Sequence, residues 1–133
     1  MNKVIIILIS LSLTSSLFAE EVTIEFLFTH TAQVTTSPQL SEENTRMEVT
    51  FDTIKKTGKL RYYSNFSNSV DVYDVSVKPA KNGIHFIHEK DSGIAILSFG
   101  LHKGEASYSN SSVMYGVLTS YQLYGNGRLL EKR

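Results

Sequence analysis

The feature that most constrains this chain is a two-residue rhythm of apolar and polar side chains. Between positions 46 and 52, the apolar residues Met47, Val49 and Phe51 alternate with polar neighbours. Successive side chains of a β-strand point to opposite faces, so this order gives one apolar face and one wet face. A helix would scatter the same three side chains around its circumference. The segment Arg46–Asp52 is therefore predicted to be a half-buried β-strand.

Seven further segments complete the set of predicted strands. They are Val22–Phe28, Lys59–Tyr63, Val70–Val77, Ile84–His88, Ile94–Phe99, Glu105–Ser109 and Val113–Tyr124. The last contains Gly116 and is predicted to be one bent strand or two, because a glycine inside a strand often marks a bulge or bend. One short helical turn is expected at Ser37–Glu43, with Ser37 as its cap and Pro38 at its first position.

Short links that end in glycine separate the central strands. They are Lys55–Gly58, Pro79–Gly83, Lys90–Gly93 and Leu101–Gly104. Glycine adopts the positive φ that a hairpin connection often needs. Links this short force antiparallel neighbours, because a parallel return needs a dozen or more residues. The sequence therefore predicts an all-β domain, an antiparallel meander of about seven to nine strands that forms either a small lipocalin-like barrel or a β-sandwich.

The N-terminus has the order of a secretory signal peptide. Lys3 precedes a mostly apolar run at Val4–Leu13, and a small residue, Ala19, stands before Glu20. We expect residues 1–19 to be removed between Ala19 and Glu20, leaving one domain at 20–133 in the periplasm or outside the cell. A membrane anchor needs about 20 predominantly apolar residues, more than this run supplies. No membrane span is expected in the mature chain, and a transmembrane barrel is disfavoured because most predicted strands are shorter than the roughly 9–11 residues it needs.

Composition and charge exclude several classes of protein. Thirteen basic and thirteen acidic residues give a formal net charge of zero, which argues against a nucleic-acid partner. The chain has no cysteine, which excludes disulfides, thiolate zinc sites and thiol nucleophiles. A hydrophobic fraction of 41% with 20% charged residues is typical of an ordered domain.

The residues that most often carry catalysis do not form a recognisable set. His85 and His88 lie three apart in a predicted strand, which points them to opposite faces and prevents them from chelating one ion. The same holds for the carboxylates of Asp71 and Asp74. There is no Gly-x-Ser-x-Gly elbow and no glycine-rich phosphate loop before a helix. The sequence therefore predicts no catalytic residue, no metal site and no cofactor.

Aromatic residues are the remaining candidates for function, with seven Tyr, seven Phe and no Trp. Tyrosines gathered on one face or around a cavity would suit a small ligand or a partner protein, whereas the alternative is core packing and cross-strand pairing. The candidate contacts are Tyr62, Tyr73, Phe86, Tyr108, Tyr115 and Tyr121. The expected function is thus an exported, non-catalytic binding or interaction module.

Two alternatives stay open. The first is a fimbrial-type assembly subunit, in which the extended segment 20–34 completes the open sheet edge of a neighbour. The second is a small hydrolase, which predicts that His85, His88 or His102 meets a carboxylate and a serine within hydrogen-bond reach.

Overall fold

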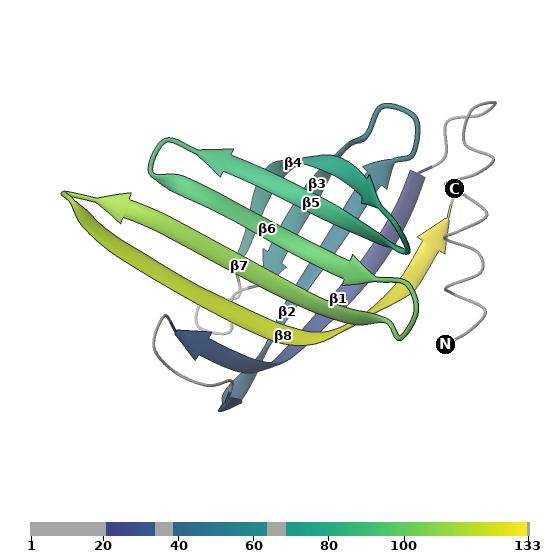
Figure 1. Ribbon diagram of the computed structural model, residues 1–133. Coiled ribbons are helices and arrows are strands. Elements are labelled where there is room, and N and C mark those ends of the chain that lie inside the picture. The colour runs from purple at the N-terminus through teal and green to yellow at the C-terminus, as the bar shows by residue number, and fades with distance from the viewer. Residues whose placement is uncertain (1–20, 34–38, 64–68, 133) are drawn as a thin grey trace.

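The structure is a computed structural model that describes residues 21–33, 39–63 and 69–132, with backbone alone at 33, 39–43, 131 and 132. The predicted signal peptide, its cleavage point between Ala19 and Glu20, and the predicted cap at Ser37 and Pro38 lie outside these residues. Figure 1 shows the eight strands. They are β1 (Glu21–Gln33), β2 (Gln39–Asp52), β3 (Thr57–Tyr63), β4 (Val70–Ala80), β5 (Gly83–Lys90), β6 (Gly93–Gly100), β7 (Glu105–Met114) and β8 (Val117–Lys132). The described ranges hold no helix long and apolar enough to cross a membrane.

The eight strands form a closed barrel. Each strand runs antiparallel to the next, and β8 pairs with β1 from Val22↔Lys132 to Gln33↔Tyr121. The predicted all-β antiparallel meander is confirmed, and of the two predicted architectures the structure is the barrel. Closure pairs β1 on both sides, which removes the free sheet edge that an open sandwich would have to protect.

The last part of the chain differs from the prediction in where its strands end. The segment Val113–Tyr124 divides at a two-residue turn, so that its first two residues end β7 and the rest begin β8. β8 then continues past Tyr124 to Lys132 through Gly125 and Gly127. A Cβ on Gly125 would lie 1.9 Å from the Leu27 carbonyl oxygen, and one on Gly127 would lie 2.7 Å from the Phe26 ring. These glycines therefore let β8 close against β1 and the core.

The predicted helical turn is wrong where the structure describes it. Residues 39–43 begin β2, with Leu40 opposite His30 and Gln39 opposite Thr31. A register shift between Phe28 and His30 accompanies this extended pairing. One isolated helical turn is marginal in water, whereas a paired strand satisfies the same backbone groups through its neighbour.

Glycine supplies the positive φ at only one of the four predicted links, at Gly104 with φ 71°. At two others the left-handed residue is Lys56 or Asn82, with φ 56° and 59°. Gly58 and Gly93 have another reason to lack a side chain. A Cβ would lie 2.5 Å from the Thr50 carbonyl oxygen at Gly58 and 1.9 Å from the Ser111 carbonyl oxygen at Gly93. These two positions serve close approach between strands.

The barrel has two ends with different interiors. We call the base the end that carries the start of β1, the end of β8 and the loops 53–56, 81–82 and 101–104, and the rim the end that carries the turns 91–92 and 115–116. The base is filled by aromatic rings. The Phe26 and Phe99 centroids lie 5.4 Å apart, and those of Phe51 and Phe86 lie 5.1 Å apart. This half of the barrel is a packed core.

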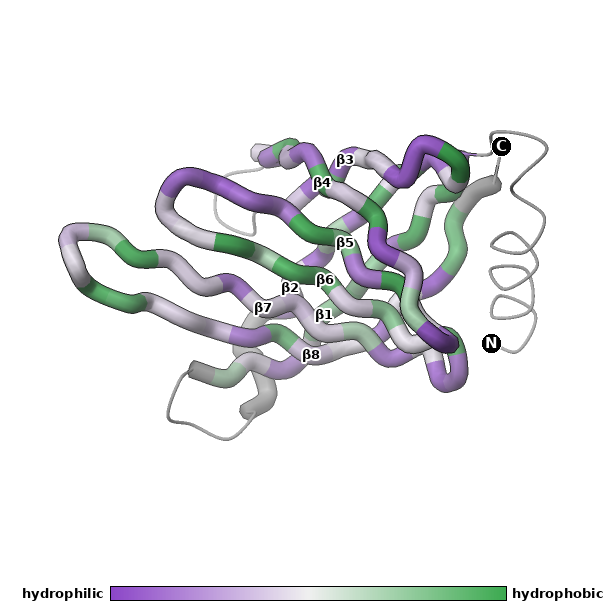
Figure 2. Tube along the Cα trace, turned by 45° about the horizontal axis from the view of Figure 1, so that its top comes forward, coloured by the Kyte–Doolittle hydropathy of each residue, from purple (hydrophilic) through white to green (hydrophobic). Residues whose placement is uncertain are grey.

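The outer surface near the β8–β1–β2 seam is polar. Glu25 accepts hydrogen bonds from Arg46 Nε at 3.1 Å and from Arg128 Nε at 2.9 Å. Such exposed pairs contribute between about 0 and 1 kcal/mol each. Figure 2 shows hydrophobic and hydrophilic residues alternating along the strands, the pattern that the sequence predicts.

Candidate functional site: tyrosines at the barrel rim

Toward the rim, the inward-facing positions change from aliphatic residues and phenylalanine to tyrosine. Tyr62 follows buried Leu60 on the inner face of β3, and Tyr121 precedes buried Leu123 on that of β8. Two more inward tyrosines come from β4 and β7. We call the following residues the rim cluster: Tyr62, Tyr73, Tyr108, Asn110 and Tyr121. The strand register therefore brings together side chains that lie up to 59 positions apart.

Asn110 links two of these phenols. Its Nδ2 donates to the Tyr108 hydroxyl at 3.4 Å and to the Tyr121 hydroxyl at 3.3 Å, and the two rings lie 6.2 Å apart. Its Oδ1 accepts from Ser112 Oγ at 3.3 Å. These are long, weak hydrogen bonds. Each phenol acts as an acceptor in them, so neither bond uses a phenol hydrogen.

Three phenols of the cluster, those of Tyr73, Tyr108 and Tyr121, have raised pKa values. Burial raises the pKa of Tyr108 well above its usual value, and the nearby Tyr121 raises it further. Burial likewise raises the pKa of Tyr121, while the hydrogen bond from Asn110 partly offsets that rise. For Tyr73, burial and then the charge of Asp71 raise the pKa. At neutral pH these hydroxyls therefore act as hydrogen-bond donors and acceptors without charge.

The barrel wall beside Tyr73 is joined differently from the rest. Pairing between β4 and β5 runs from Ala80↔Gly83 to Ser76↔Ile87, and no further pairs are found in the described part of this seam toward the rim. There His88 spans the two strands instead. Its Nδ1 donates to the Asp74 carbonyl oxygen at 2.8 Å, and its ring lies 4.8 Å from the Tyr73 ring. A hydrogen bond from the His88 side chain thus links β4 and β5 next to the cluster.

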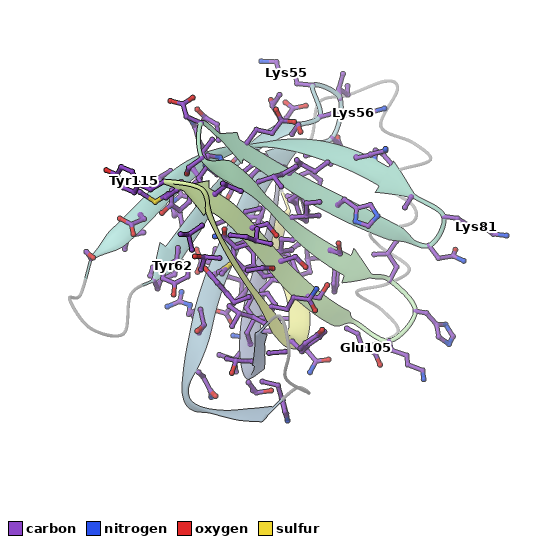
Figure 3. The ribbon with its side chains drawn as sticks, turned by 60° about the vertical axis from the view of Figure 1, so that its left-hand side comes forward. Lys55, Lys56, Tyr62, Lys81, Glu105 and Tyr115 are labelled. Carbon is purple, nitrogen blue, oxygen red and sulfur yellow. The ribbon has the colours of Figure 1, made fainter. Side chains whose placement is uncertain are left out.

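The structure brings four of the six predicted contact residues together: Tyr62, Tyr73, Tyr108 and Tyr121. It separates the other two. Phe86 is 1% exposed in the core of the base, and Tyr115 is 99% exposed at the end of the β7–β8 hairpin. In Figure 3, Tyr62 and Tyr115 lie on one side of the molecule, and Lys81 and Glu105 lie on the other.

Sequence reasoning missed the polar partner of the cluster. The predicted strand ended at Ser109, whereas β7 continues to Met114. Extending its two-residue period would have placed Asn110 and Ser112 on the inner face with Tyr108.

The three histidines of the hydrolase hypothesis occupy separate places. His85 faces outward, where its Nδ1 lies 2.7 Å from Ser98 Oγ on the neighbouring strand, whereas His88 contacts Tyr73 on the inner side. His102 is exposed in the β6–β7 loop at the base. Within the described ranges, no group of three metal-ligating side chains comes together. These contacts do not assemble the histidine, carboxylate and serine that the hydrolase hypothesis requires.

Comparison with known proteins adds no relative: no family model matches the chain, and no curated protein matches it. A proposal for the function therefore has to be argued from the side chains of the rim cluster.

Proposed function

We propose that this protein is an exported, non-catalytic binding module that holds a small organic ligand at the rim cluster. The observation that carries the proposal is the convergence of four inward tyrosines, from β3, β4, β7 and β8, above a base filled by packed side chains. Tyr62, Tyr73 and Tyr121 are only half-buried, so part of each side chain is accessible to solvent. Sites for small ligands combine such apolar ring faces with a few placed polar groups.

The side chains of the site favour a neutral or cationic ligand with an apolar or aromatic body. The phenol rings offer faces for stacking, and their protonated hydroxyls and Asn110 offer hydrogen bonds. Asp71 lies opposite Tyr62 in the β3–β4 register, and its charge raises the pKa of Tyr73, so a carboxylate stands beside the cluster. The rim cluster itself contains no lysine or arginine to balance an anionic ligand, and Lys90, which shares the inward parity of Phe86 on β5, is exposed at the rim.

The assembly-subunit alternative receives no support from the closed barrel. A donor-strand mechanism needs a free strand and an open edge. In the described residues, β1, which covers most of the predicted donor segment, is paired with both β2 and β8. Strand exchange would require this barrel to open first.

Fluorescence titration with N-phenyl-1-naphthylamine, a neutral aromatic probe, tests the proposal. We expect saturable binding that weakens by roughly three- to tenfold in Tyr62→Ala, as expected for loss of one aromatic contact. Tyr121→Phe tests the contribution of its hydroxyl to binding. Its matched control is Tyr124→Phe, since the Tyr124 hydroxyl donates to Gln122 on the outer face of the same strand. Equal affinity for the wild type and Tyr62→Ala, or no saturable binding, would contradict the proposal.

A further inference from the structure

The hairpin formed by β7 and β8 extends beyond both of its neighbours. The β6–β7 ladder ends at Ser112, the Val113 N–H donates one further bond to the Ser92 carbonyl oxygen at 2.7 Å, and β1 pairs with β8 only as far as Tyr121 in the described residues. In the six residues of Val113–Leu118, the pairs Val113↔Leu118 and Met114↔Val117 flank the turn at Tyr115 and Gly116. We call these six residues the hairpin tip. In Figure 1 this hairpin reaches farther out than the β5–β6 hairpin beside it.

The hairpin tip is apolar on both faces. The pairs Val113↔Leu118 and Met114↔Val117 place apolar side chains on opposite faces of the ribbon. All are exposed, Leu118 by 61% and Val117 by 63%. Figure 2 shows the contrast with the hydrophilic β5–β6 turn. The sequence contains no charged residue between Glu105 and Arg128, so the whole outer part of this hairpin is uncharged.

We propose that the hairpin tip inserts into the interfacial region of a lipid bilayer. A bilayer covers both faces of a protruding ribbon at once, whereas a flat protein surface covers only one. A second copy of the chain is disfavoured by size, because a stable protein contact uses about 20–30 residues on each side. Exposed apolar patches on monomeric proteins mark protein or membrane interaction sites, and the two-sided shape of this tip favours the membrane.

The dimensions of the tip fit this location. Beyond Val113, which is still bonded to Ser92, two residues per strand at about 3.4 Å each give a projection of about 7 Å, within the roughly 5–10 Å depth at which interfacial elements lie. Below the tip is a collar of uncharged hydroxyl groups, in which Ser111 Oγ and Ser120 Oγ lie 3.3 Å apart. These hydroxyl groups can form hydrogen bonds with the hydrated lipid headgroups. Because the tip and collar carry no basic residue, insertion does not require anionic lipids.

Tyr115 gives independent support from the backbone. It occupies the first turn position with φ 52°, followed by Gly116 with φ 76°, the arrangement of a type I′ turn. This position strongly favours Asn, Asp or Gly, and a bulky residue with positive φ is unusual. The Tyr115 ring is 99% exposed and therefore makes no packing contact that would explain its presence. A ring with a polar hydroxyl suits the membrane–water interface, where tyrosine is enriched.

The first test uses the absence of tryptophan from the chain. Tyr115→Trp introduces a single fluorophore at the tip, and Ile54→Trp introduces one at an exposed apolar position on the base. Phosphatidylcholine vesicles should shift the emission of Trp at 115 to shorter wavelength and protect it from acrylamide. The variant at 54 should show neither change.

The second test measures vesicle binding by co-sedimentation. Leu118→Asp should lower the partition coefficient by about ten- to a hundredfold, because it removes one buried aliphatic side chain and adds a charge. Ile54→Asp is the matched control and should bind like the wild type. Urea unfolding establishes that both variants are folded.

Three results would overturn the inference. One is unchanged emission from Trp at 115 in the presence of vesicles. Another is wild-type partition of Leu118→Asp. The third is an emission shift that depends on protein concentration without vesicles, together with self-association in sedimentation, which would assign the tip to a second copy. None of these depends on whether the rim cluster binds a ligand.

Discussion

At the scale of single residues, the buried phenols set how stability responds to alkaline pH. Burial raises the pKa of Tyr108 and Tyr121 in the folded protein, whereas both titrate near 10 in the unfolded chain. Between the unfolded and folded pKa values, the folded state therefore binds more protons than the unfolded state. The contribution of these residues is fully present below pH 10 and is lost as pH rises toward the folded pKa.

We therefore expect the free energy of unfolding to fall above pH 10, by at most about 1.4 kcal/mol per pH unit for each tyrosine. Tyr108→Phe and Tyr121→Phe should each make this fall shallower. Tyr124→Phe is the control, because its hydroxyl bonds Gln122 on the outer surface. Urea unfolding between pH 9 and 11 measures the slopes, and parallel curves for all four proteins would rule out this role for the buried phenols.

A second residue-scale prediction concerns the glycine that allows the barrel to close. Gly125→Ala should lower the free energy of unfolding by roughly 1–3 kcal/mol, because the new Cβ meets backbone on β1 and only a shift of the strand relieves it. The nearest of these atoms is the Leu27 carbonyl oxygen, at 1.9 Å. Gly100→Ala is the matched control, since its nearest atom would be the Glu105 carbonyl oxygen at 3.7 Å. Equal thermal midpoints for the two variants would contradict the close approach described here.

At the scale of elements, the β7–β8 hairpin combines an unfavourable turn residue with an exposed apolar tip. Tyr115→Asn creates the Asn-Gly sequence that type I′ turns favour. We expect the variant to be more stable than the wild type by roughly 0.5–1 kcal/mol in urea unfolding, and to bind vesicles less well. The reverse change, Asn82→Tyr at φ 59°, should destabilise the protein. A less stable Tyr115→Asn variant would show that the ring supports the fold.

At the scale of the whole molecule, the barrel should exchange its amide hydrogens unevenly. The Asp74 carbonyl points toward β5, where it accepts from His88, and the N–H of the same residue points to the same side. The amides of Val72 and Asp74 therefore face the part of the seam beyond the last β4–β5 pair, whereas those of Tyr73 and Val75 face β3. Hydrogen exchange followed by NMR should be fast for the first pair and slow for the second. Similar protection of all four amides would mean that this seam is paired.

The architecture of the whole molecule could be predicted from the sequence only in part. Alternation identified the strands and their inner faces, and short links fixed their antiparallel order. The choice between barrel and sandwich was not encoded there, because both share the two-residue period. Closure depends on the long-range pairing of Val22 with Lys132 and on the glycines of β8, whose effect appears only when β1 lies against them.

The candidate site was predictable to a similar extent. Four tyrosines of the rim cluster were identified from their residue type alone. Phe86 lies apart from the rim cluster, because its parity matches that of the tyrosines while its position along the barrel axis places it in the base. Asn110 was missed, because polar residues at a strand end resemble a loop until the register of β7 on β8 is known.

The position of the chain ends has a practical consequence. The described chain starts and finishes at the base, where Val22 lies opposite Lys132, while the hairpin tip and the rim cluster lie at the other end. A biotin or affinity tag at the C-terminus would therefore immobilise the protein with its rim directed away from a sensor surface. Ligand and vesicle measurements on such a chip would sample one uniform orientation.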